Sequence, residues 1–185
     1  MSAFMNWILT DLGEKHPMFG CEAEFQLELA LWFRTHIPRL DVRLEVNAFH
    51  DRSRDRLDLA LVGMKTAVEL KYAPDSSAAA DTYRHGFIKD ICRLEKLCST
   101  PHWNAGHAII VAARSDLWTQ ATRRNNDREF EIYNQRNLHG KLRWAERTSQ
   151  KIKSDYPALE VDGHYRLHWK RFGGKGARYL AVDVH

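Results

Sequence analysis

The stretch RLDLALVGMKTAVELKYA, residues 56–73, holds two segments with strand character on either side of a short turn. RLDLALV, residues 56–62, and TAVELKY, residues 66–72, place apolar side chains at alternate positions, which is the period of a β-strand. Because the connection is short, we expect the two strands to pair antiparallel. A further strand expected over residues 41–49 extends this pair into a meander.

The second of these strands carries a glutamate and a lysine two positions apart. Residues i and i+2 project from one face of a strand, so Glu69 and Lys71 point one way, and Val68 and Leu70 point the other way. A glutamate-any-lysine triplet occurs about once by chance in a chain of this composition. The pair alone therefore does not distinguish a functional site from a salt bridge on a solvated strand face.

Asp58 in the neighbouring strand supplies a second carboxylate. It projects from the face opposite the three leucines of its strand, Leu57, Leu59 and Leu61. If the two strands are paired neighbours, Asp58 lies beside Glu69 and Lys71. Two carboxylates and one ammonium group would then gather on one side of the sheet.

The segment CEAEFQLELALWFRTHIP, residues 21–38, has the period of an amphipathic helix that ends before its proline. Glu22 falls near the middle of the apolar stripe and Gln26 beside it, whereas Glu24 falls on the polar face. Burial of a glutamate needs a partner, and contact with the strand charges, directly or through a metal ion, would supply one. The stripe itself consists of Phe25, Leu29, Trp32, Phe33 and Ile37.

The whole chain, residues 1–185, is interpreted as a single α/β domain with a mixed sheet flanked by helices. The remaining expected elements are helices over 3–12, 86–99, 115–124 and 141–154, a buried strand over 106–113, and a C-terminal β-hairpin formed by 164–172 and 177–184.

In this combination the chain resembles the PD-(D/E)XK nuclease superfamily, the restriction-endonuclease-like proteins. The resemblance rests on Glu22 in a leading helix, Asp58 in the second strand and Glu69-Leu70-Lys71 in the third. It covers a core of about residues 21–113 with the order αβββαβ, followed by C-terminal additions over 114–185. Leu57 stands where the name of the motif has proline. The stretches YRHGFIKDICRLEKL, GHYRLHWKRF and RYLAVDV are also similar to a group of uncharacterised bacterial proteins of this superfamily.

The resemblance implies a metal-dependent nuclease that hydrolyses phosphodiester bonds of nucleic acid, DNA more than RNA. Asp58, Glu69, the Leu70 carbonyl and Glu22 would bind Mg²⁺ or Mn²⁺, which prefer hard oxygen ligands. Lys71 would orient the attacking water, whose pKa the metal lowers. The alternative is a catalytically inactive module of the same fold that binds nucleic acid or protein.

The resemblance also suggests supporting residues around these five. Gln26 and Asp90 would support the site from outside the ligand set, with Asp90 ordering the sheet. Lys89 in the helix over 86–99 would contact phosphate. The alternative is that Lys89 and Asp90 are ordinary solvated charges.

A second basic region lies in the C-terminal hairpin, where Arg171 and Lys175 are candidate nucleic-acid contacts. Basic residues that alternate with aromatic ones bind nucleic-acid backbones and stack on bases. The simpler reading is that the aromatic residues pack and the charges are solvated. The other members of this region are Tyr165, Arg166, Trp169, Lys170, Phe172 and Arg178.

The composition, with 44% hydrophobic and 28% charged residues, is that of a soluble globular protein. Three cysteines, the lack of a basic leader and the lack of a bilayer-length apolar run predict a cytoplasmic protein without a membrane partner. The net charge of +4 permits nucleic-acid binding. Structural zinc on Cys92, Cys98, His102 and His107 is a weaker alternative, because the spacing is not that of a zinc finger. The oligomeric state is left open, with a homodimer as one option.

Overall fold

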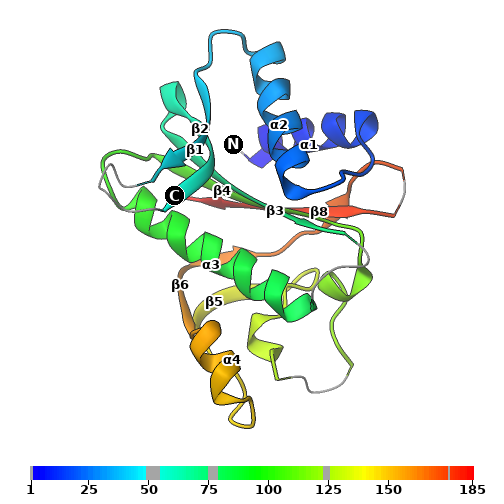
Figure 1. Cartoon of the computed structure of the whole chain (residues 1–185), viewed down its shortest axis with the longest axis vertical. Coiled ribbons are helices and arrows are strands. Elements are labelled where there is room, and N and C mark those ends of the chain that lie inside the picture. Colours follow the sequence, from blue (N-terminus) through cyan, green and yellow to red (C-terminus); the bar gives the residue numbers. More distant parts are fainter. Residues whose placement is uncertain (1, 49–54, 75–78, 123–125, 175) are drawn as a thin grey trace.

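The computed structural model describes residues 2–48, 55–74, 79–122, 126–174 and 176–185. A central sheet has helices α1 and α2 on one face and α3 on the other (Figure 1). The helices are α1 (Ser2–Lys15), α2 (Glu22–His36), α3 (Ala80–Cys98) and α4 (Gln150–Asp155); the strands are β1 (Val42–Asn47), β2 (Arg56–Leu61), β3 (Thr66–Ala73), β4 (Ala105–Ala112), β5 (Asn137–Leu142), β6 (Leu159–Arg166), β7 (Lys170–Arg171) and β8 (Arg178–Val184). The α/β class and the mixed sheet flanked by helices are confirmed.

The large sheet has the strand order β1-β2-β3-β4-β8-β7. Strands β1, β2 and β3 form the expected antiparallel meander, β3 and β4 are parallel, and β8 is antiparallel to β4. Helix α3 connects β3 to β4, as parallel neighbours require a crossover connection. In the β2–β3 register Leu59 is paired with Val68, so one step further along the ladder Asp58 lies opposite Glu69.

Alternation along β3 divides the core into two layers. Val68, Leu70 and Tyr72 pack with α1 and α2, whereas Ala67 and Ala73 pack with α3. The expected stripe of α2 is confirmed, since Phe25, Leu29, Trp32 and Phe33 are buried and Ile37 packs against the same layer. Glu69 and Lys71 therefore face α3.

The expectation that the three leucines of β2 share one layer is wrong for Leu57. Leu59 and Leu61 pack with α1 and α2, but Leu57 packs on the α3 side. The neighbouring strand is irregular at the same level, where Glu45 has φ 52° between the paired residues Leu44 and Val46. This irregularity lies beside Asp58.

Residues 137–166 form a second sheet that the sequence pattern does not predict. Strands β5 and β6 pair antiparallel, and β6 packs against α3, below α3 in Figure 1. The helix expected over 141–154 is wrong at its start, because β5 continues to Leu142 and α4 begins only after the Ser149 side chain caps it. The expected C-terminal hairpin is shorter than predicted, with β7 pairing to β8 over two residues, and residues 164–166 belong to β6.

The helix expected over 115–124 is also wrong in the described residues. A single 3-10 turn, Ser115–Leu117, is present instead. Arg84 of α3 donates to the Asp116 carbonyl at 2.6 Å and forms a buried ion pair with Asp127. The hydrogen bond from Arg84 occupies the Asp116 carbonyl, which a longer helix would need for its own hydrogen bonds. Helix α3 in turn starts earlier than expected, at Ala80.

None of the helices in the described part of the chain combines the length and the apolar character that a bilayer span requires.

Candidate functional site

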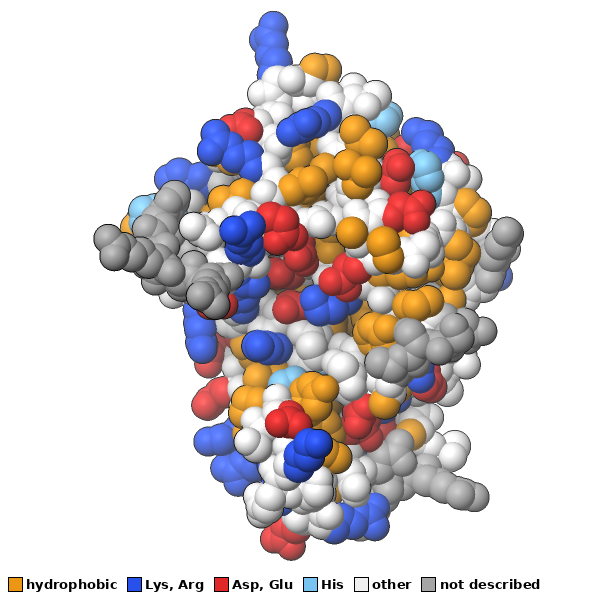
Figure 2. Space-filling view, in the orientation of Figure 1, with side chains coloured by type: hydrophobic (Ala, Val, Ile, Leu, Met, Phe, Trp, Pro, Cys, Tyr) orange, Lys and Arg blue, Asp and Glu red, His pale blue; other side chains and the backbone are white. Residues whose placement is uncertain are grey.

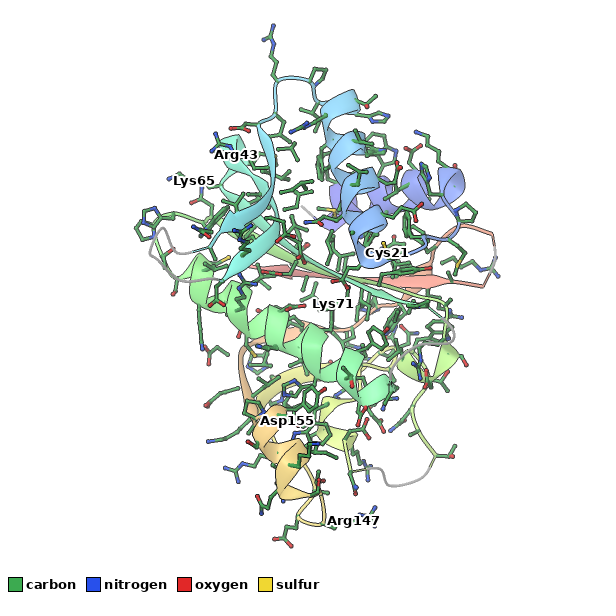
Figure 3. All side chains as sticks on the ribbon, viewed as in Figure 1. Cys21, Arg43, Lys65, Lys71, Arg147 and Asp155 are labelled. Atoms are coloured by element: carbon green, nitrogen blue, oxygen red, sulfur yellow. The ribbon has the colours of Figure 1, made fainter. Side chains whose placement is uncertain are left out.

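The predicted site residues meet between α2 and α3, next to β2 and β3. Figure 2 shows acidic side chains gathered with basic ones near the middle of this face, and Figure 3 places Lys71 between the two helices. Lys71 reaches across the sheet surface to α3, where a Cβ on Gly86 would lie 3.6 Å from the Lys71 Cε atom. Its side chain is 24% exposed, so the ammonium group is accessible from one side.

Asp58 lies where the hydrogen bonding between β2 and β3 stops. Its Oδ2 atom accepts a hydrogen bond from the Leu70 N–H at 2.6 Å, so a side chain takes the place of the next ladder partner. The predicted proximity of Asp58 to Glu69 and Lys71 is confirmed by this contact and by the register.

Lys71 is the cation at the centre of the cluster. Its Nζ atom lies 3.1 Å from Asp90 Oδ2 and 3.9 Å from Glu22 Oε1. It also donates to the Leu70 carbonyl at 3.0 Å, the same oxygen that the resemblance assigns to a metal ion. Lys71 thus connects α2, β3 and α3.

Glu69 is held by a residue that the sequence did not suggest. Arg93 Nη1 lies 2.7 Å from Glu69 Oε1, and Arg93 Nη2 donates to the Arg56 carbonyl at 2.6 Å. The Glu69 side chain is 3% exposed. Asp90 and Arg93 are three residues apart in α3 and so share one side of the helix, and this spacing is the signal that could have identified Arg93.

Glu22, and not Glu24, is the helix carboxylate of the cluster. Glu22 Oε2 accepts from the Tyr72 N–H at 3.0 Å, whereas Glu24 accepts from the Gly20 N–H. The expectation of a glutamate inside the apolar stripe is wrong, because Glu22 is the first residue of α2 and its side chain is 43% exposed. It reaches the sheet from the first turn of α2.

Gln26 links α2 to the strands. Its Nε2 atom donates to the Asp58 carbonyl at 2.5 Å and to Glu45 Oε1 at 3.0 Å. Asp90 is buried at the edge of α3 and contacts Lys71. Both residues thus contact the cluster, in the positions that a supporting role requires.

The electrostatics of the cluster are dominated by an excess of carboxylates. Burial, together with the nearby Asp90 and Asp58, raises the pKa of Glu69 to about 9, against the opposing effect of Arg93 and Lys71. Burial also raises the pKa of Asp90 to about 6 and raises the pKa of Glu22.

Lys71 responds to the same carboxylates with the opposite sign. Burial alone would lower the pKa of Lys71, but Asp90, Glu22 and Asp58 outweigh it and the pKa is raised. The ammonium group therefore keeps its charge.

The donor set suits a hard divalent cation. Four carboxylates face two cations, and the buried atoms Glu69 Oε1 and Asp90 Oδ2 have no well-aligned hydrogen bond within the described residues. Hard oxygen ligands with uncompensated negative charge are what Mg²⁺ or Mn²⁺ prefers. The carboxylates nevertheless point at separate partners, and the described ranges contain no preformed group of three or more His, Cys, Asp or Glu side chains placed to hold a metal.

The other predicted contacts do not join the cluster. Lys89 is exposed on α3. Arg171 is exposed in β7, at the far edge of the sheet beyond β4 and β8. Lys175 lies outside the described residues. Of the aromatic residues in that region, Trp169 and Phe172 are buried, which confirms the packing interpretation for these two.

The residues considered for zinc have other partners. The Cys92 thiol donates to the Glu160 carbonyl, and Cys98 lies near the Val184 carbonyl. His107 Nδ1 lies 2.8 Å from Asp183 Oδ1, a partner in β8 that the sequence did not reveal. These contacts account for the buried positions of Cys92 and His107 without a metal.

Comparison of the chain with models of protein families, with curated proteins and with solved structures finds no match.

Proposed function

We propose that this protein is a metal-dependent nuclease that hydrolyses phosphodiester bonds, in DNA more than in RNA. In this proposal α2-β1-β2-β3-α3-β4 forms a PD-(D/E)XK core. The observation that carries the proposal is the position of Lys71, whose partly exposed ammonium lies within 4 Å of Glu22 and Asp90, beside Asp58 and Glu69. A partly exposed cation held among carboxylates is a functional-site signature, since such clusters shift pKa values.

The side chains divide the work of phosphodiester hydrolysis. Lys71 orients the attacking water and stabilises negative charge on the phosphate, because its charge is maintained by its carboxylate neighbours. The Lys71 side chain runs past Gly86 of α3 and is held at its end by Asp90. Gln26 fixes the backbone carbonyl of Asp58 in β2.

Asp58, Glu69, Glu22 and the Leu70 carbonyl would hold the cation. Bound Mg²⁺ or Mn²⁺ supplies Lewis-acid activation of water and phosphate. Glu69 and Asp58 would share the cation with their present partners, Arg93 and the Leu70 N–H, or give these partners up.

The alternative function is an inactive binding module of the same fold. It is favoured by the same contacts, since the Arg93–Glu69 pair and the Asp58–Leu70 hydrogen bond give both carboxylates partners without a metal.

The two functions are separated by incubating the purified protein with plasmid, linear and single-stranded DNA and with RNA, each with Mg²⁺, Mn²⁺ or EDTA. A nuclease yields cleavage products that disappear in EDTA. A binding module yields salt-sensitive binding without cleavage under any of these conditions.

Metal binding is expected to release a proton near neutral pH. Glu69, with its pKa raised to about 9, carries a proton at pH 7.5, and a carboxylate must lose its proton to become a ligand. The affinity for Mn²⁺ should therefore rise with pH up to about 9. Calorimetric titration at pH 7.5 in buffers of different ionisation enthalpy measures the release, which should approach one proton in the wild type and vanish in Glu69→Gln. Mn²⁺ binding without proton release would exclude Glu69 as a ligand.

A further inference from the structure

A cation-lined groove lies along the β8 edge of the large sheet, away from β2 and β3, which carry the candidate site. Two adjoining cavities of about 470 and 330 Å³ share His164, Tyr165 and Arg166. The larger one extends along the edge of β8, at Ala181–Asp183, and past Lys170. We name the two together the β6–β8 groove. Strand β4 separates β8 from β3, so the groove is distinct from the Glu69 cluster.

Arg166 is held in this groove by neutral partners. Its Nε and Nη2 atoms donate to Gln135 Oε1 at 3.1 and 3.0 Å, and its Nη1 atom donates to Asn137 Oδ1 at 3.0 Å. In the described part of the chain it forms no ion pair with a carboxylate. The guanidinium is thus fixed in position while its charge remains uncompensated, which prepares it for an anion.

The remaining lining adds positive charge and exposed rings. Lys170 is exposed beside Arg166 in the larger cavity. His139 and His164 are stacked with their ring centroids 4.7 Å apart, and His168 lies at the same groove. Asp183 is the acidic side chain that lines the two cavities in the described residues, and it is paired with His107.

We propose that the β6–β8 groove binds a single-stranded segment of nucleic acid, with Arg166 and Lys170 on phosphates and the His139–His164 pair stacked against a base. Binding here does not require a metal ion or the Glu69 cluster, so it holds for a nuclease and for an inactive module alike. In a nuclease, the groove would hold a part of the strand away from the cleaved bond.

A nucleic-acid strand fits these features better than an acidic protein segment. The two cavities meet at residues 164–166 of β6, and one extends to β5 and the other to β8, so the site is elongated and suits successive phosphates rather than one anion. Flat, exposed rings next to fixed cations are the combination that single-strand binding proteins use, because every base offers a face for stacking. Unpaired bases are required for this stacking, which favours a single strand over a duplex.

The test is fluorescence anisotropy with short labelled single-stranded DNA, in EDTA, for the wild type and for Arg166→Gln/Lys170→Gln. Loss of two phosphate contacts should reduce the salt slope by about 1.4 and weaken binding roughly 10- to 30-fold at about 0.1 M salt. His164→Ala should weaken binding at least about fivefold with little change in the slope. The matched control is Arg39→Gln/Lys151→Gln, which removes the same charge from exposed positions outside the groove.

Thermal unfolding of each variant verifies that it folds, and the groove cations are exposed, so the midpoint should not change. Equal affinity and equal salt slope for the groove and control variants would overturn the proposal, as would a wild type that does not bind single-stranded DNA. Equal binding of duplex DNA, or of polyglutamate, with the same dependence on Arg166 and Lys170 would overturn the single-strand assignment. These outcomes are independent of cleavage, which tests the proposed nuclease separately.

Discussion

Cleavage by the Lys71→Ala variant is expected to be about 10²- to 10³-fold slower than cleavage by the wild type, the range found when one preorganised charge-stabilising group is removed. The reason is geometric. The Lys71 ammonium is fixed by Asp90 at 3.1 Å and by the Leu70 carbonyl at 3.0 Å, so its charge is preorganised to stabilise a phosphate. The measurement is single-turnover cleavage of DNA with Mg²⁺.

Lys96→Ala is the matched control, because it removes a lysine from an exposed position of α3. It should cleave at the wild-type rate. Glu69→Ala should lose activity to a degree similar to Lys71→Ala, since it removes a metal ligand. If Lys71→Ala retains cleavage while its fold and its metal binding are intact, the proposed role of the lysine is wrong.

The Glu69→Gln variant is expected to be more stable than the wild type at alkaline pH and equal to it near pH 4.5. The folded protein raises the pKa of Glu69 from 4.5 to about 9. Between these values the folded state keeps a proton that the unfolded state has lost, so wild-type stability falls as pH rises through this window. Glutamine resembles the protonated form and does not ionise, so it avoids this loss, which amounts to about 5 kcal/mol at pH 8.

Urea unfolding in EDTA at pH 5 and pH 8 measures this difference. Glu14→Gln, an exposed position in α1, should leave the free energy of unfolding nearly unchanged at both pH values. A Glu69→Gln variant whose stability relative to the wild type does not change with pH would contradict the raised pKa. The expected result would also mean that Glu69 is retained for function at the expense of stability.

The core of the fold could be predicted because its patterns have one interpretation. Val68 and Leu70 alternate with Glu69 and Lys71, and only a strand places them on opposite faces. The stripe of α2 has a helical period over many residues, so tertiary contacts do not override it. The meeting of Asp58 with Glu69 followed from the short connection between β2 and β3.

The later elements could not be predicted because their patterns are ambiguous. Leu138 and Leu142 are four residues apart, and this spacing places them on one side of a helix and equally on one face of a strand. Residues 137–142 form a strand because they pair with β6. Leu57 lies in the other layer at the level where Glu45, in the neighbouring strand, has a positive φ. Arg93 is polar and half-buried, so only its partner identifies it as part of the cluster.

Because the Leu70 N–H donates to Asp58, hydrogen exchange at this backbone amide depends on what Asp58 binds. This amide lies inside β3, yet its acceptor is a carboxylate that the proposed cation would also bind. A cation that takes Asp58 would leave the amide without its acceptor, and exchange with solvent deuterium would speed up there while the Lys71 amide next to it stays protected. In a chain that does not bind the metal, Mg²⁺ would leave the exchange rate of the Leu70 amide unchanged. The exchange rate of this one amide therefore distinguishes a site that binds metal from one that does not.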